Sequence, residues 1–202
     1  MNPNLNSSLS LDFLGTLKTK TAASHKRLEK LPVSSSILSS EMKIQDYTRY
    51  LMLMYDVHHS VEEQVFPLLE HVFEDLTDRT KKYLIEEDLA YLHYPQPVAK
   101  SVFNTENITV AFACGILYVI EGSSLGGRFI LKNVESVPGL HEGKGVSYFT
   151  GYGNKTGSRW NNFLKVLTKF EEENNGEEII KGAIYAFDCI HNHFLQEGIN
   201  EN

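Results

Sequence analysis

The sequence of 202 residues has few cysteines and no excess of basic residues. Cys114 and Cys189 are its only cysteines, so it has neither a disulfide framework nor a CxxC metal-binding motif. Its 19 basic and 26 acidic residues give a formal net charge of −7. This charge excludes a general nucleic-acid-binding protein, which would need a basic face. An anionic ligand would need a local basic patch.

Long hydrophobic runs are also missing. No stretch approaches the roughly 18 to 20 apolar residues of a membrane span. The first eleven residues lack the basic region and apolar run of a signal peptide. We therefore expect no membrane partner and a reducing, cytoplasmic setting. The composition, 42% hydrophobic and 22% charged, is typical of one globular domain at this length.

Apolar residues recur at steps of three and four along most of the chain, and no run shows the period-two alternation of a sheet. We predict an all-α single-domain bundle over residues 12–196, with flexible tails at 1–11 and 197–202. The predicted helices cover about residues 12–30, 43–73, 78–92, 105–130, 158–172 and 177–196. Pro67 should interrupt the second of these helices. Residues 134–153 form a glycine-rich connector.

His25 shares the apolar face of the first predicted helix with Leu14, Leu17 and Leu28. A neutral imidazole in an apolar pocket is a good iron ligand. Glu29 lies one turn further on and could accept a hydrogen bond from the other ring N–H, as happens at many metal-bound histidines. The alternative is a histidine packed at a helix interface, with Glu29 in a surface ion pair.

Three glycines interrupt the fourth predicted helix: Gly122, Gly126 and Gly127. Each glycine in a helix costs roughly 1 kcal/mol relative to alanine. Their presence indicates that a ligand approaches the backbone closely or that the helix bends. A flat cofactor would need such a surface. The alternative is close packing between helices through small residues.

Basic residues gather in the first helix at Lys18, Lys20, Lys26, Arg27 and Lys30, and again at Arg159, Lys165 and Lys169. Lys18 shares the face of His25, about 10 Å away along the helix axis. This offset suits a cation that reaches the carboxylates of a large planar ligand. The alternative for each charge is solvated surface, which is what we expect for the acidic residues of the third helix.

Two stretches together resemble a known family. The stretch from Lys18 to Glu29 resembles the proximal helix of heme oxygenases, and the stretch from Tyr118 to Gly127 resembles their glycine-rich distal helix. The similarity is greatest to bacterial members, including those that supply bilin to bacteriophytochromes, and it extends from about residue 11 to 195. Weaker similarities lie at residues 87–91 and at Phe187 and Phe194.

The resemblance implies a heme-oxygenase-like bundle with a kinked distal helix. It also implies heme b as substrate and cofactor, O2 as oxidant, and biliverdin, ferrous iron and CO as products. His25 would be the proximal iron ligand, and Glu29 would orient it. Gly122, Gly126 and Gly127 would let the distal helix lie on the heme. Heme propionates would pair with Lys18 and Lys165, with help from Arg159, while Phe187 and Phe194 would line the pocket.

The sequence has no Rossmann-type glycine fingerprint and no iron–sulfur cysteine set, so electrons would come from an external reductase or ferredoxin. A bacteriophytochrome would be a possible bilin acceptor.

Ser123 stands where many members have an aspartate that organises distal water, and His58 stands where many have a tyrosine. Ser123, the adjacent Ser124 and His58 are therefore candidates for holding the water that delivers protons. The missing aspartate also leaves open a heme carrier or sensor without turnover. A third alternative is a non-heme diiron oxidase, because three pairs have ligand spacing on a helix: His58–Glu62, His59–Glu63 and Asp188–His191.

Overall fold

The computed structural model describes the backbone of residues 3–199 and the side chains of residues 13–196. All regular elements in this part of the chain are helical, which confirms the predicted all-α domain. In chain order they are α1 (Pro3–Glu29), α2 (Pro32–Ser36), α3 (Ile44–Ser60), the π-helical turn η1 (Val61–Val65), α4 (Phe66–Leu69), the 3-10 turn η2 (Leu76–Arg79), α5 (Lys82–Tyr91), α6 (Val110–Val134), α7 (Ser147–Thr150), the 3-10 turn η3 (Gly153–Lys155), α8 (Thr156–Glu172) and α9 (Gly176–Ile199).

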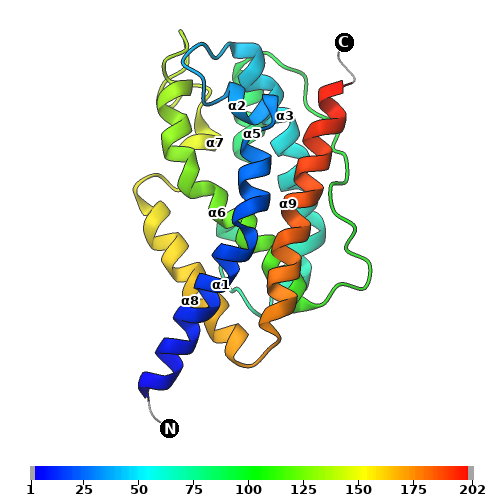
Figure 1. Cartoon of the computed structure of the whole chain (residues 1–202). Coiled ribbons are helices and arrows are strands. Elements are labelled where there is room, and N and C mark those ends of the chain that lie inside the picture. Colours follow the sequence, from blue (N-terminus) through cyan, green and yellow to red (C-terminus); the bar gives the residue numbers. More distant parts are fainter. Residues whose placement is uncertain (1–2, 200–202) are drawn as a thin grey trace.

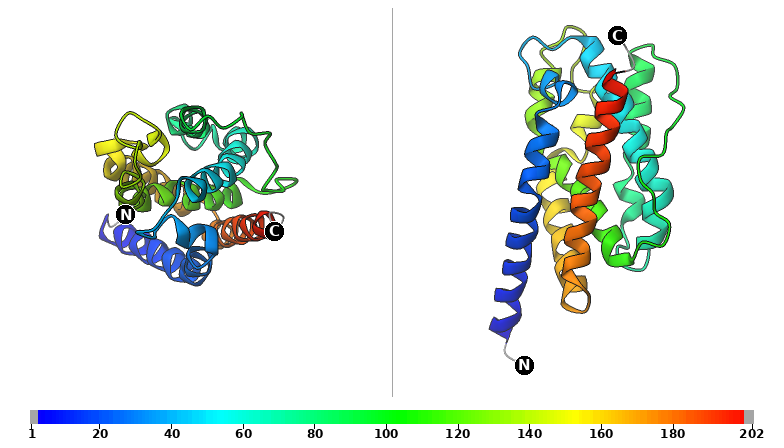
Figure 2. Two further views of the ribbon diagram at one scale, coloured as in Figure 1. Left: turned by 90° about the horizontal axis from the view of Figure 1, so that it is seen from above. Right: turned by 45° about the vertical axis from the view of Figure 1, so that its right-hand side comes forward.

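Helix α6 is the central element of the bundle. It contacts α9, α8, α7 and α4, while α9 also packs along α1 (Figure 1). Seen from above, α1 and α9 lie on one side of α6, and α3 and α5 lie on the other (Figure 2). Helix α6 runs unbroken through its glycines and bends along its length (Figure 1). Helix α6 therefore contains the predicted distal segment and also makes most of the helix–helix contacts around that segment.

The length and composition of α6 also reach those of a membrane span, with a mean hydropathy of 1.4 in its most apolar window. This differs from the expectation that no such stretch exists. The apolar character has a structural cause, because α6 packs against four other helices and 56% of that window is buried inside the protein. The helix is long and apolar because it forms the core of the bundle.

Two glycines allow α6 and α9 to cross at close range. A Cβ atom at Gly115 would overlap the backbone carbonyl oxygen of Ile179, and one at Gly182 would overlap the carbonyl oxygen of Phe112. Neither position tolerates any side chain without moving a helix. The close packing that we considered for the later glycines therefore exists in α6, but at Gly115.

Several helix boundaries differ from the predicted ones. Helix α1 begins at Pro3 rather than near residue 12, so it extends through most of the predicted N-terminal tail, whose side chains lie outside the described part. Likewise, α9 reaches Ile199, while residues 200–202 fall outside the described chain. The predicted third helix is divided into η2 and α5, and the predicted connector contains α7 and η3.

The helix that we predicted over residues 43–73 is interrupted before Pro67, where η1 forms a π-helical turn. Proline has no N–H for the helical ladder, and its ring crowds the carbonyl group four residues earlier. A local widening to π-helical hydrogen bonding relieves that crowding. The predicted interruption is thus present, and it lies in the turn that precedes the proline.

Candidate functional site

His25 is accessible on α1. Its side chain is 58% exposed, and its Nδ1 atom lies 3.6 Å from Oε2 of Glu29. The ring meets that of Phe187 edge to face, with 5.6 Å between the ring centroids. Nδ1 therefore faces the predicted orienting carboxylate, and Nε2 is left for a ligand. This exposure does not fit the alternative of a histidine packed between helices.

Aromatic side chains form a wall beside His25. Phe187 and Phe194 are buried and lie seven residues apart, on one face of α9. Phe194 contacts the ring of Tyr50 edge to face, and Tyr50 stacks on Phe149 of α7. The two predicted phenylalanines thus belong to one aromatic surface, which α3 and α7 extend with residues that the sequence analysis did not identify.

The glycines of the distal segment leave open room instead of permitting close helix packing. A Cβ atom at Gly126 would meet no atom within 4 Å. At Gly122 and Gly127 it would be 3.6 Å from Trp160 and 3.5 Å from Phe149, which are ordinary contact distances. None of the three has a positive φ, so the backbone does not require glycine there either. The space suits a flat molecule that lies against the helix backbone, and the contact of these glycines with heme remains a prediction.

A small cavity with both polar and apolar walls lies next to the distal segment. Its walls come from α3, α6, α7 and the residues around η2 and η3, and they include Lys81, Ser123, Ser124, Gly127 and Tyr148. Residues of α1 do not line it, so neither His25 nor Glu29 borders the cavity directly. Of the predicted distal residues, Ser123 and Gly127 border this cavity, while His25 and Glu29 form a separate cluster with Phe187.

His58 does not line the cavity, although we predicted it among the distal residues. Tyr148 lies between His58 and the cavity. Its side chain is buried, and its Nε2 atom is 3.1 Å from the hydroxyl oxygen of Tyr148, which does line the cavity. Burial lowers the pKa of His58 well below its usual value, and the positive charge of Lys81 lowers it further. His58 is therefore neutral at pH 7 and acts on the cavity only through Tyr148.

Asp88 holds α7 in place, although we expected the acidic residues of this helix to be solvated. It is fully buried and accepts hydrogen bonds from the backbone N–H groups of Ser147 (2.7 Å) and Tyr148 (2.9 Å) and from the Tyr47 hydroxyl (3.1 Å). Burial raises the pKa of Asp88, and these donors oppose the rise. Through α7, Asp88 positions both Tyr148 and Phe149. The only signal in the sequence was the weak similarity at residues 87–91.

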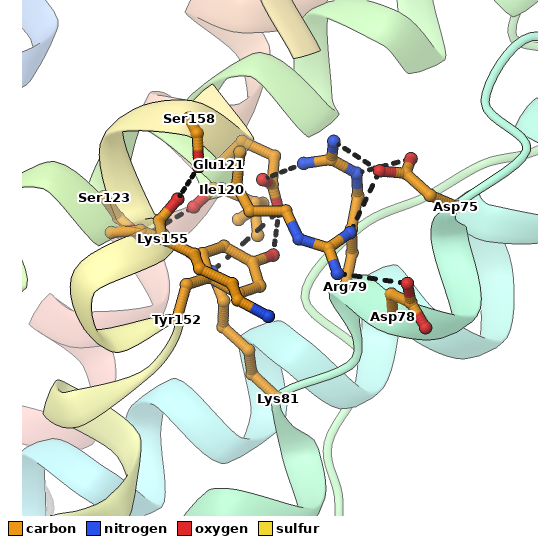
Figure 3. A network of polar contacts seen from close by, with 12 residues as sticks. Asp75, Asp78, Arg79, Lys81, Ile120, Glu121, Ser123, Tyr152, Lys155 and Ser158 are labelled. Atoms are coloured by element: carbon orange, nitrogen blue, oxygen red, sulfur yellow. Dashed lines mark hydrogen bonds and ion pairs between the residues drawn. The ribbon is translucent and has the colours of Figure 1, made fainter. Parts of the chain in front are cut away.

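A buried charge network supports α6 immediately before Gly122 (Figure 3). Arg79 has no exposed side-chain surface and pairs with Glu121 of α6 and, at 2.8 Å, with Asp75. The Tyr152 hydroxyl donates to Glu121 at 3.0 Å, and Lys81 Nζ lies 3.9 Å from the same carboxylate. The first distal glycine therefore follows a residue that side chains from two other segments, residues 79–81 and Tyr152, hold in place.

Arg159 belongs to this network and not to the predicted propionate site. Its guanidinium lies 3.2 Å from Asp75 and 3.0 Å from Asp78. Because two carboxylates already occupy it, we do not retain Arg159 as a heme ligand. Lys18 on α1 and Lys165 on α8 are exposed, and neither has an ion-pair partner among the described side chains. Their pairing with propionates remains a prediction.

The side chains proposed for a diiron site have other partners. Glu62 accepts hydrogen bonds from the backbone N–H groups of Lys81 and Lys82, Glu63 pairs with Lys82, and Asp188 pairs with Arg27. Among residues 13–196, no group of three or more histidine, cysteine, aspartate or glutamate side chains is placed to hold a metal ion. The geometry therefore gives the diiron alternative no support.

Comparison with known proteins decides the family. The model of the family described as heme oxygenase matches residues 11–196. The chain belongs to the heme oxygenase family. It is 28% identical over 178 residues to heme oxygenase PigA of Pseudomonas aeruginosa, a match that covers 85% of this chain and 86% of PigA.

Solved heme oxygenases share the fold. The NO- and CO-bound enzyme of Neisseria meningitidis superposes with a TM-score of 0.74 at 23% identity, over 90% of this chain and 92% of that one. The heme oxygenase of Leptospira interrogans gives 0.73 at 20% identity, over 91% and 98%. Heme oxygenase-1 of Synechocystis, solved in complex with heme, gives 0.72 at 16% identity, over 93% of each chain.

Proposed function

We propose that this heme oxygenase binds heme between α1 and α6 and cleaves it with O2 and external electrons to biliverdin, ferrous iron and CO. The observation that carries the proposal is an accessible His25 on α1 whose Nδ1 faces Glu29, and the open space at Gly126 on α6 supports it. A histidine with a carboxylate at one ring nitrogen and no partner at the other suits an axial ligand. Open space along a helix backbone suits a flat ring.

Each cluster of residues has a distinct part in this proposal. Bound heme would supply the iron at which O2 is activated, and it is itself the molecule that is oxidised. His25 would ligate the iron through Nε2, with Glu29 facing Nδ1 and fixing the ring tautomer. Phe187 would hold the imidazole in place from α9 and help to exclude water. Lys18 and Lys165 would pair with the propionates.

The distal residues would control access and protons. The segment Gly122–Gly127 would lie against the ring, and its position is set by the buried Glu121 network. The lining of the cavity beside it offers hydroxyl groups and the amino group of Lys81, and it contains no carboxylate. Weak donors of this kind deliver protons without the strong acid that a peroxidase-like reaction would use. Neutral His58 would hold the Tyr148 hydroxyl at the cavity wall.

The electrons would come from a separate reductase or ferredoxin. The resemblance of the stretch from Tyr118 to Gly127 to heme oxygenases that supply bilin to bacteriophytochromes supports a bilin acceptor of that class. Two free cysteines support a cytoplasmic setting.

A heme carrier or sensor is the second candidate. One observation favours it, because Ser123 donates its hydroxyl proton to the Ile120 carbonyl oxygen at 2.7 Å and not toward the cavity. The two functions differ when reductant and oxygen are added to the hemin complex in the presence of catalase. An oxygenase loses its Soret band while a biliverdin band grows, whereas a carrier keeps a stable oxygen complex.

Hemin titration tests the shared binding step. Equimolar hemin should give a Soret band that shifts in His25→Ala. Absence of a Soret band from the wild-type protein would overturn both candidates.

A further inference from the structure

Two adjacent serines line the distal cavity, and they differ in what their hydroxyl groups can do. Ser123 and Ser124 both follow Gly122 on α6, and both border the cavity. In a helix, a serine commonly donates its proton to a carbonyl group of the preceding turn. Ser123 does so, toward Ile120 (Figure 3). Its proton is therefore committed to its own helix.

Ser124 has a different partner. Its oxygen accepts a hydrogen bond from the Lys81 ammonium, which reaches it from the turn before α5. Among the residues that the structure describes, no acceptor holds the hydroxyl proton of Ser124. A lysine ammonium can only donate, so the Ser124 oxygen must act as the acceptor in this pair. The proton of Ser124 is left to donate elsewhere.

Lys81 is held firmly in this position. Its side chain is buried, with Nζ 3.9 Å from Glu121 and 4.6 Å from the centre of the Tyr152 ring. Burial lowers the pKa of Lys81, and the positive charge of Arg79 lowers it further, while Glu121 and Glu62 raise it. The two carboxylates favour an ammonium that donates to Ser124.

We propose that Lys81 is a positioning residue that turns the Ser124 hydroxyl into the hydrogen-bond donor of the distal cavity. The inference rests on the proposed function, because the acceptor is the water or oxygen ligand at the iron of bound heme. According to this proposal, Ser124, and not Ser123, has the function that the distal aspartate has in many family members. It also assigns a role to Lys81, which the sequence analysis did not single out.

The test uses the acid–alkaline transition of the hemin complex, in which water at ferric iron loses a proton and the visible spectrum changes. A donor that stabilises the hydroxide form lowers the pH midpoint of this transition. Ser124→Ala should raise the midpoint by roughly one pH unit, the size expected for one hydrogen bond to a charged group. Ser123→Ala is the matched control and should leave the midpoint unchanged.

Lys81 variants test the positioning role. Lys81→Met should raise the midpoint as Ser124→Ala does, and the double variant should shift it no further than the larger single shift. Lys81→Arg keeps the charge and the donors, so it should restore most of the wild-type midpoint. Urea unfolding of each apo-protein separates these shifts from loss of the fold.

Two results would overturn the inference. The first is a midpoint that moves in Ser123→Ala but stays fixed in Ser124→Ala. The second is a double variant whose shift equals the sum of the single shifts, because Lys81 would then act independently of Ser124. In both cases the wild-type Soret band still forms, so these results leave the heme binding on which the proposed function depends intact. A missing Soret band in the wild-type protein would instead overturn the proposed function.

Discussion

Gly126→Ala should make the apo-protein more stable and its heme complex weaker. The position lies within α6, and a Cβ atom there would meet nothing within 4 Å. Alanine in a helix is more favourable than glycine by about 1 kcal/mol. Because no clash offsets this gain, the free energy of unfolding of the apo-protein should rise by about that amount. For a chain of this length, the melting temperature should rise by roughly 2–4 °C.

The same methyl group should disfavour heme. If the ring lies against the backbone at Gly126, the added methyl overpacks the interface and costs roughly 1–3 kcal/mol of binding free energy. The dissociation constant for hemin should then increase by roughly 5- to 150-fold. Urea unfolding of the apo-protein and Soret titration of the same sample measure the two effects separately.

Gly157→Ala provides the matched control. Gly157 lies in the first turn of α8, and a Cβ atom there also meets nothing within 4 Å. This variant should not lose stability, and it should bind hemin like the wild-type protein. If Gly126→Ala binds hemin as tightly as Gly157→Ala does, the open space at Gly126 is not a heme surface and the reasoning is refuted.

Three further predictions concern the fold around the site. Gly115→Ala should lower the free energy of unfolding by roughly 1–3 kcal/mol or more, because the added Cβ overlaps the Ile179 carbonyl oxygen. Urea unfolding that is unchanged in this variant would contradict the close crossing of α6 and α9. Glu121→Gln leaves Arg79 and Lys81 without their buried anion and should lower the free energy of unfolding by roughly 3–5 kcal/mol. A decrease below about 1 kcal/mol would show that the protein does not need the network for stability. The pKa of buried His58 is lowered on folding, so unfolding takes up a proton once the pH falls below the unfolded value of about 6.5. Stability should therefore decrease with falling pH by up to about 1.4 kcal/mol per unit, and His58→Gln should remove this part of the slope; equal slopes in the two proteins would show that His58 is not held neutral.

Apolar periodicity was sufficient to predict the helices that pack with one apolar face. It located α6, α8 and α9 to within a few residues, because their apolar residues repeat at helical spacing over four turns or more. It missed α2 and α7, which have five and four residues and are too short to show a repeat. Their position depends on tertiary contacts such as the hydrogen bonds from α7 to Asp88.

The site was predictable where one helix carries the signal, as in His25 with Glu29 and in the distal glycines. The residues that the prediction missed depend on long-range pairing. Arg79 and Glu121 are 42 residues apart, and Lys81 and Ser124 are 43 apart. Sequence alone does not distinguish a buried charge from a solvated one, so Asp88 was expected at the surface, and Lys81 and Arg79 were not identified. Arg159 was misplaced for the same reason, because nothing local indicates that Asp75 and Asp78 lie beside it.

The central claim is that this chain oxidises heme at His25. It is tested most directly by chromatographic identification of the bilin formed from hemin, with an electron supply and catalase present. The wild-type protein should convert hemin to biliverdin, and His25→Ala should not. A wild-type hemin complex that yields no bilin, or a His25→Ala variant that yields as much as the wild type, would contradict the account.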